Sequence, residues 1–405
     1  MTDVLPRWPV SCERMQDVIG ELRVRQVGLG GDRMRLEATE LTEGEQALRE
    51  EVRAFLTARL PAGSYLLGLG MAGDVDPQFS RELGARGWLG MALPKEYGGG
   101  GRSAVDRLVV VEELLAIGAP VGYHWVADRQ SGPNIAANGT VEQKRYFLPR
   151  IARGELCFAI GMSEPDAGSD LASVRTKAIP ADGGWLINGR KIWTTAAYAA
   201  TYIVGLFRTS GDRYGGLTQF IVDPTSAGLT ISRIPFIDGT QEFCEVAFED
   251  VFVPDSMRLG AVGAGWGQNT AELVLERSGV DRWMSLMPVL EHWAANVSGR
   301  AQADLGSITA RCWAFHGMSL AIARMVDAGL SPTMEAALAK EMATRFEQEC
   351  IEIVTRHYGR TPQLTSPDPH ESLLARAILT GPSWTIRGGT TEILRNIIAK
   401  GLTRE

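Results

Sequence analysis

The carboxylate of Glu276 has the clearest chemical signature in the sequence. Apolar residues around it, from Trp266 to about Val297, recur at the spacing of one helix. At 100° per residue, one narrow face of that helix carries Leu273, Glu276, Val280, Met284 and Met287. A carboxylate in an apolar face is costly to ionise, so we expect a raised pKa and a group that accepts a proton near neutral pH. The pattern fits equally well a structural glutamate that pairs with a buried arginine or sits at the wet end of the face.

Three other segments carry residue types that could hold a flat or anionic ligand. The segment SEPDAGSD at 163–170 offers hydroxyls and backbone N–H groups, and KIWTT at 191–195 sets an indole beside two hydroxyls. The segment GGTTE at 388–392 combines two glycines with a threonine N-cap, which lets a ligand approach a helix N-terminus closely. Each segment also has an ordinary interpretation: a loop, a core tryptophan and a capped helix.

Other patterns argue against several classes of site. GLGMAG at 68–73 matches GxGxxG, but a helical pattern precedes it and no strand–turn–helix unit surrounds it, so we interpret it as a turn. No GxSxG nucleophile elbow is present. The five cysteines and five histidines are scattered, which predicts neither a disulfide framework nor a metal site.

Length and composition indicate a globular protein of two or three domains. The 405 residues are 45% hydrophobic and 22% charged, and the net charge of −7 leaves no basic footprint for nucleic acid. No run of eighteen apolar residues occurs, and the N-terminus lacks the apolar stretch of a secretory segment. We therefore expect a cytoplasmic protein without membrane contact.

The periodicity changes twice along the chain, which predicts an α+β multidomain fold. Residues 1–40 resemble a tail, and helical patterns fill 41–156, with turns at 98–101 and 132–133. Residues 157–259 hold short β-type runs, with a turn signal at Asn188–Gly189, as in a small barrel or sandwich. Helical spacing returns over 260–405.

A series of motifs carries a family resemblance over about residues 42–402. In chain order they are GWLG (87–90), PKEYGG (94–99), GTVEQK (139–144) with LP (148–149), MSEPDAGSD (162–170), NGRKIWTT (188–195), FEDVFVP (248–254) and GGTTEI (388–393). Together they resemble the acyl-CoA dehydrogenase family. The resemblance implies an N-terminal helical domain, a middle β-barrel and a C-terminal four-helix bundle.

The resemblance also implies an activity. An acyl-CoA thioester loses its α-proton to a carboxylate and its β-hydride to FAD, giving a trans-2-enoyl-CoA, and an electron-transfer flavoprotein reoxidises the FAD. The positions matching the family's FAD contacts are Ile160, Met162, Ser163, Ser169, Trp193, Thr195, Thr390, Thr391 and Glu392. Those matching substrate contacts are Ser169, Arg277 and Gly389.

The position of the base distinguishes two groups within the family. Many members carry a glutamate directly before the Gly-Thr of the final loop, where this chain has Gly388. A second group places it on a helix of the C-terminal bundle, immediately before an arginine. Counted from GAGW at 263–266, that position is Glu276, followed by Arg277. The resemblance therefore implies that Glu276 is the catalytic base.

Two departures from the family pattern concern assembly. Homotetrameric members donate an Arg–Phe–Gly motif, a glutamine and a Gly-Gly loop to a neighbour's FAD. Residues 297–314 lack that motif, and RHYGR at 356–360 has Arg360 in place of the second glycine. The chain thus resembles the catalytic-type subunit of the α2β2 enzymes that actinobacteria use on bulky, steroid-derived acyl-CoA. A tetramer completed by a homologous subunit follows. The alternatives are a non-catalytic partner subunit, and a flavin oxidase or monooxygenase on the same fold.

Overall fold

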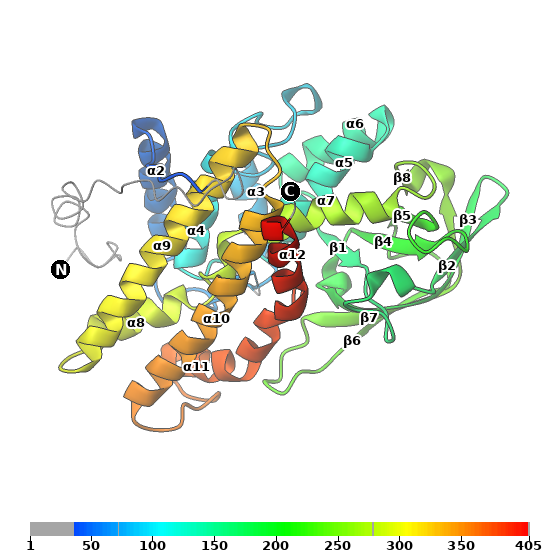
Figure 1. Ribbon diagram of the computed structural model, residues 1–405. Helices are drawn as coiled ribbons and strands as arrows, with labels where there is room; N and C mark the ends of the chain where they lie inside the picture. The colour runs from blue at the N-terminus through cyan, green and yellow to red at the C-terminus, as the bar shows by residue number, and fades with distance from the viewer. Residues whose placement is uncertain (1–35, 72, 278, 404–405) are drawn as a thin grey trace.

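The computed structural model describes residues 36–403 except 72 and 278. The predicted tail, residues 1–40, lies mostly outside this part of the chain. Helices fill the first and last thirds, and the strands lie between them in sequence and at one side of the molecule (Figure 1).

The N-terminal region is helical because its helices have strong start signals and apolar faces. Its elements are α2 (Glu43–Arg59), α3 (Pro77–Ala85), η1 (Lys95–Tyr97), α4 (Ala104–Ala116), η2 (Ala127–Ser131), α5 (Gly132–Asn138) and α6 (Val141–Ala152). Thr42, Ser103 and Thr140 each form a capping box with the residue three positions later. The described residues of GLGMAG, 68–71 and 73, lie between α2 and α3, and neither a strand before them nor a helix directly after them occurs in the described chain.

The middle region is one eight-stranded sheet. Its strands are β1 (Phe158–Gly161), β2 (Lys177–Ala181), β3 (Gly184–Thr195), β4 (Tyr202–Arg208), β5 (Leu217–Val222), β6 (Leu229–Arg233), β7 (Phe243–Pro254) and β8 (Arg258–Leu259). The order is β6-β7-β3-β2-β4-β5-β8, and β1 pairs with β4 in parallel. Short 3-10 turns lie at Leu171–Ser173, Ala197–Ala199 and Asp255–Met257. Buried residues of these strands, such as Ile187, Phe207 and Phe220, form their own apolar core.

The C-terminal region is again helical. It comprises α7 (Gly265–Arg277), η6 (Val280–Arg282), α8 (Met287–Asn296), α9 (Ala301–Asp327), α10 (Thr333–Tyr358), α11 (Pro369–Thr380), η7 (Gly381–Thr385) and α12 (Thr391–Thr403). Helix α10 packs against α7, α9 and α12 and so lies at the centre of this region. In Figure 1, α7 runs from these helices toward the sheet. The predicted order of helices, strands and helices is confirmed.

Two predicted turns are wrong. Gly132–Pro133 does not break the helix, because η2 is a π-helical turn that continues directly into α5. The wider π turn already interrupts the regular hydrogen-bond pattern just before Pro133, which has no N–H to donate. Asn188–Gly189 is not a hairpin turn either: β3 continues through it, with a bulge against β7 between Ile187 and Gly189. Gly189 has φ +140, and a Cβ there would lie 2.7 Å from Thr176 Oγ1.

The single helix predicted from Trp266 to Val297 is also wrong. Helix α7 ends at Arg277, and α8 begins only at Met287. The carbonyl oxygen of Glu276 accepts hydrogen bonds from the Arg129 and Arg282 guanidinium groups, so side chains replace the backbone donors of a longer helix. Glu276 therefore does not lie in a continuous apolar face.

None of the described helices is long and apolar enough to cross a membrane. No group of three or more His, Cys, Asp or Glu side chains placed to hold a metal ion is found among residues 36–403 with their two gaps.

Candidate active site

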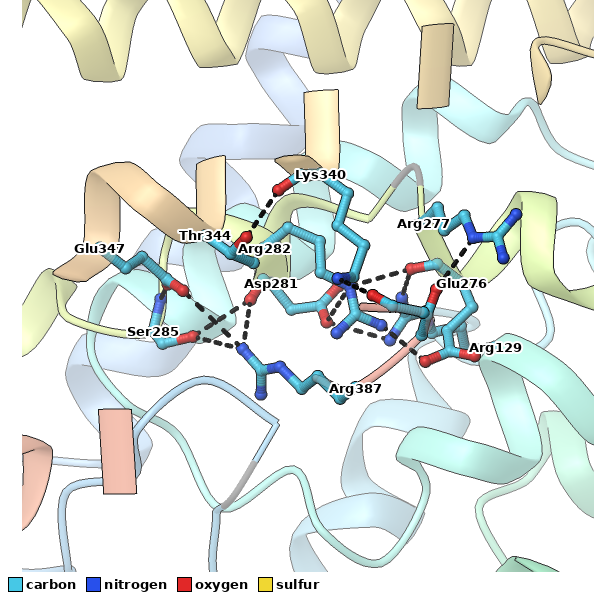
Figure 2. A network of polar contacts seen from close by, with 12 residues as sticks. Arg129, Glu276, Arg277, Asp281, Arg282, Ser285, Lys340, Thr344, Glu347 and Arg387 are labelled. Carbon is cyan, nitrogen blue, oxygen red and sulfur yellow. Dashed lines mark hydrogen bonds and ion pairs between the residues drawn. The ribbon is translucent and has the colours of Figure 1, made fainter. Parts of the chain in front are cut away.

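The Glu276 carboxylate lies at the C-terminal end of α7, paired with a buried arginine. Arg282 Nη2 donates to Glu276 Oε1 at 2.9 Å, and the Arg282 side chain is only 1% exposed (Figure 2). This pairing matches one of the two interpretations that the sequence left open. The second carboxylate oxygen, Oε2, makes no hydrogen bond with any described residue.

Glu276 also lies against the glycine loop that precedes α12. A Cβ built on Gly388 would lie 2.9 Å from Glu276 Oε1 and 3.3 Å from Lys340 Cε. Gly388 and Gly389 have φ of +67 and +106, conformations that glycine adopts at little cost. The carboxylate carried by α7 therefore fills the space that a side chain at 388 would occupy.

Cationic side chains surround this carboxylate on several elements, as Figure 2 shows. Arg129 pairs with Asp281 at 3.1 Å, and both side chains are buried. Arg282 approaches the same Asp281 oxygen at 3.4 Å. Arg387 donates to Ser285 Oγ at 3.0 Å and to the Asp281 carbonyl oxygen at 3.2 Å. Asp281 thus holds three arginines from η2, η6 and the loop before α12.

The protonation of this network departs from ordinary values in physically consistent directions. Burial acts to raise the pKa of Asp281, but Arg129 and Arg282 outweigh it, so the pKa is lowered. Burial and the charges of Arg282 and Arg387 lower the pKa of Lys340 to about 7. The region therefore combines a firmly ionised carboxylate with a lysine whose charge is costly.

Glu272 is a second carboxylate that the sequence analysis missed. It is buried one helical turn before Glu276, and its Oε1 accepts from Gln130 Nε2 at 2.9 Å. Its Oε2 is buried without a partner among the described residues. Burial and the charge of Glu276 raise the pKa of Glu272 to about 8. The spacing of Gln268, Glu272 and Glu276 by four residues was the signal that could have revealed this polar face.

On the sheet side, the predicted FAD contacts of β1 and β3 lie close together. Ser163 accepts a backbone hydrogen bond from Ile192 at 2.9 Å, and Lys191 donates to the Met162 carbonyl oxygen at 3.1 Å. Ile160 lies on β1, just before this pair, and Thr195 ends β3. The structure thus brings the predicted Ile160–Ser163 and 193–195 segments to one end of the sheet.

Trp193 presents an exposed aromatic plane at this end. A register shift between Lys191 and Thr194 forms a bulge, and Trp193 has φ +60, which is unusual for a residue with a side chain. Its indole is 52% exposed and packs edge-on against Phe243. It is therefore not the core tryptophan of the alternative interpretation, and the bulge points its ring outward.

Glu242, which is hydrogen-bonded to the residue after β3, lies near the arginine that precedes the glycine loop. The backbone N–H of Ala196 donates to the Glu242 carbonyl oxygen at 2.8 Å. Burial and the nearby Asp238 raise the pKa of Glu242, and the charges of Arg376 and Arg387 partly oppose them. Arg387 directly precedes Gly388, so this edge of the sheet and the glycine loop lie within electrostatic range of each other.

The remaining predicted residues lie at the start of α12 and on a loop. Helix α12 begins at Thr391, so Thr390 takes the N-cap position and Glu392 lies in the first turn. Ser169 is exposed on the loop after β1, and no contact joins it to the Glu276 network. Arg277 is buried and donates from Nε to the Gly388 carbonyl oxygen at 2.9 Å.

The late loop after α10 is closed by its own side chains. Arg360 pairs with Glu371 through both guanidinium nitrogens at 2.6 Å, and Glu371 also accepts from Ser366 Oγ at 2.8 Å. Gly359 ends α10 with φ +74. The arginine that replaces the second glycine of the family loop is therefore engaged within this chain.

Comparisons with known proteins agree with this geometry. Residues 42–155, 159–251 and 298–403 match the N-terminal, middle and C-terminal domain models of acyl-CoA dehydrogenase. Acyl-CoA dehydrogenase FadE26 of Mycobacterium tuberculosis is 32% identical over 399 residues, covering 90% of this chain and 98% of that protein.

Solved structures show the same likeness. The Tcur3481-Tcur3483 steroid ACAD aligns with a TM-score of 0.80 at 28% identity, over 90% of this chain and 99% of that one. The ChsE4-ChsE5 complex from Mycobacterium tuberculosis aligns with a TM-score of 0.76 at 30% identity, over 91% of this chain and 100% of that one. The resemblance inferred from the motifs is confirmed, and the chain belongs to the acyl-CoA dehydrogenase family.

Proposed function

We propose that the protein oxidises an acyl-CoA thioester to its trans-2-enoyl-CoA, with Glu276 as the base that removes the α-proton. The observation that carries this proposal is that a side chain at Gly388 would meet the Glu276 carboxylate, since a Cβ there would lie 2.9 Å from Glu276 Oε1. Many family members carry the base at the position of Gly388, and here a carboxylate from α7 reaches the same point in space. The free Oε2 is then the atom that accepts the proton, while Arg282 orients the carboxylate through Oε1.

The family is FAD-dependent, and features of this chain fit the cofactor. The outward-facing indole of Trp193, beside Met162 and Ser163, offers a plane for a flat ring. The start of α12 offers Thr390, Thr391 and Glu392 at a helix N-terminus, where an anionic group is favoured. FAD, when bound, supplies the acceptor for the hydride from the β-carbon. This chain's own residues bind and orient the thioester and take the α-proton.

The pairing of Glu276 with Arg282 also favours a second candidate, a non-catalytic subunit of a heteromeric enzyme. In that case Glu276 serves only to neutralise a buried arginine, as buried ion pairs do elsewhere. Replacement of the carboxylate distinguishes the two candidates, because turnover depends on the Glu276 carboxylate only if it is the base.

For the substrate, we propose a bulky and largely apolar acyl group, with steroid-derived acyl-CoA as the first to test. A cavity of about 380 Å³, a volume in the range of small-molecule sites, adjoins the network through Arg129 and Asp281. Its other walls are mostly apolar, including Leu93, Trp125 and Val280. The steroid ACAD among the similar structures supports the same class of substrate.

For the assembly, we propose a tetramer of the α2β2 type in which a homologous subunit completes each FAD site. The Arg360–Glu371 pair occupies the loop that homotetrameric members donate to a neighbour. An electron-transfer flavoprotein is the proposed electron acceptor. The ChsE4-ChsE5 complex among the similar structures supports a two-protein assembly.

The decisive test uses the chain co-expressed with its homologous partner. Anaerobic bleaching of the flavin absorbance by acyl-CoA substrates is recorded for the wild type and for Glu276→Gln. Loss of a general base predicts a bleaching rate lower by about 10²–10⁴-fold. Glu272→Gln is the matched control, since it removes a buried carboxylate from the same helix and should stay within about tenfold of wild type. Unchanged bleaching in Glu276→Gln would assign the chain to the non-catalytic role.

The assembly is tested separately by the visible spectrum of the chain purified alone. A folded but colourless protein that gains flavin on co-expression is the expected result. A yellow homotetramer with one FAD per chain contradicts the proposed partner and leaves the chemistry of Glu276 in place.

A further inference from the structure

Two buried cations beside the glycine loop have no carboxylate partner in the part of the chain that the structure describes. Lys340 on α10 is 0% exposed, and Arg277 on α7 is also buried. Neither makes an ion pair with any described residue. Burying a charge without a counter-ion is expensive, and the lowered pKa of both groups reflects the cost of burial. A nearby anion or dipole stabilises a buried cation of this kind.

Each cation instead holds one backbone carbonyl of the loop. Arg277 Nε donates to the Gly388 oxygen at 2.9 Å, and Lys340 Nζ donates to the Gly389 oxygen at 2.8 Å. In a trans peptide the N–H points opposite to the C=O. The N–H groups of Gly389 and Thr390 therefore point away from the two cations, and neither has an acceptor within the described part of the chain.

The same two N–H groups lie at the N-terminus of α12, which has 13 residues. The dipole of that helix adds partial positive charge at this end. Oriented donors, a helix N-terminus and two unpaired cations behind the peptides thus favour negative charge at one point. That point is close to Glu276, because a Cβ on Gly388 would lie 2.9 Å from Glu276 Oε1.

We propose that Lys340 and Arg277 are positioning residues for the thioester carbonyl oxygen. They fix the two peptides so that the N–H groups of Gly389 and Thr390 receive this oxygen, and their charges stabilise the negative charge that it gains when the α-proton leaves. The electron pair of the broken C–H bond is delocalised onto this oxygen, and the proton goes to Glu276. This inference rests on the proposed dehydrogenation.

The charges that face Lys340 come from three other elements. Arg282 on η6, Arg387 before the loop and Arg277 on α7 repel its proton, whereas Glu276 on α7 attracts it. Among these groups the cations outnumber the carboxylate. Negative charge on the ligand therefore restores the balance and returns the lysine to its ordinary charged state.

The test measures ionisation of a bound ligand instead of turnover. Acetoacetyl-CoA, whose α-proton is acidic, is added at pH 6 to the co-expressed, flavin-containing protein, and the enolate is followed by its ultraviolet absorbance. In the wild type we expect more enolate than in free solution. Lys340→Met should lower the enolate-to-keto ratio by about tenfold, the usual size of one charge-assisted hydrogen bond. Lys340→Arg should restore most of it.

Two further variants make the outcome decisive. Lys400→Met removes an exposed lysine of α12 and should leave the ratio unchanged. If Lys340→Met does not fold, Arg277→Met decides the matter, with the same expected loss. An unchanged ratio in the folded variant, or no enolate on the wild type, overturns this inference. Retained bleaching in Glu276→Gln instead overturns the proposed function, so the two failures are distinguishable.

Discussion

The two ends of α10 differ in how far this chain completes its own structure around them. In its N-terminal half, Lys340 donates to the glycine loop and faces charged side chains of α7 and η6. At its C-terminal end, Gly359 and Arg360 turn into a loop that Glu371 closes. The first end places a buried lysine against the glycine loop, and the second pairs its arginine with Glu371.

The comparison indicates that one helix serves two functions that can be separated. The base region, meaning the network around the proposed base Glu276, is held by contacts within this chain. The loop at the other end is closed by the Arg360–Glu371 pair of this chain. This difference is what the proposed assembly requires, in which this chain supplies the base and a homologous partner completes the cofactor site. Four variants test this division.

Asp281→Asn should have the largest effect, because it breaks the base region at its centre. The buried carboxylate balances Arg129 and Arg282, at 3.1 and 3.4 Å. Removing one partner of a buried ionic group costs about 3–5 kcal/mol of unfolding free energy. Urea unfolding measures this, and Asp304→Asn, at a more exposed site, should cost far less. Equal losses in both variants would contradict the importance of the buried network.

Gly388→Ala should act on turnover more than on folding. The new methyl group would lie 2.9 Å from Glu276 Oε1 and strain a residue at φ +67. Displacing the carboxylate should slow flavin bleaching by about 10²-fold, as small misplacements of catalytic groups do. Gly317→Ala on α9, where a Cβ meets no atom within 4 Å, is the control and should bleach normally. Normal bleaching in Gly388→Ala would show that the close contact is unimportant.

Glu272→Gln should change how stability depends on pH. Burial and the charge of Glu276 raise the pKa of Glu272 from an ordinary value of 4.5 to about 8 in the folded protein. Between these values the folded state holds a proton that the unfolded chain has released, so stability falls as pH rises, by roughly 1.4 kcal/mol per pH unit. The glutamine variant should lose this contribution. Chemical denaturation of both proteins from pH 5 to 8 measures the difference, and parallel profiles would exclude a protonated Glu272.

Arg360→Ala should have the smallest effect. The arginine is largely exposed, so solvent screens its pair with Glu371, which keeps Ser366 and the Gln363 N–H as donors. We expect a modest decrease in melting temperature and unchanged bleaching in the co-expressed complex. If this variant, purified without a partner subunit, acquired FAD and formed a homotetramer, the two ends of α10 would not be independent.

The fold class and the helix start at the glycine loop could be predicted from the sequence because both depend on local patterns. Capping boxes at Thr42, Ser103 and Thr140 define helix starts, and GGTTE defines the start of α12 through its own residues. The motifs also place Trp193 and Met162 in neighbouring segments. The domain boundaries and the roles of the individual site residues stay predictions.

The network around Glu276 could not be predicted because its partners are distant in sequence. Arg129 and Gln130 come from η2, Lys340 from α10 and Arg387 from the loop before α12. Periodicity assumed one continuous helix and therefore placed Glu276 in an apolar face. The guanidinium groups that end α7 at Arg277 are invisible to a pattern that reads one segment at a time.

The π-helical turn of η2 has a consequence for how related chains are compared. The Gly132 N–H donates to the Ala127 carbonyl oxygen five residues earlier, so the turn holds one residue more than an α-helical turn. This extra residue lets the adjacent Arg129 and Gln130 both reach α7, at the Glu276 carbonyl and at Glu272. A relative with a regular helix here should align with a gap of one position. That gap would mark chains that lack the contacts of Arg129 and Gln130 with α7.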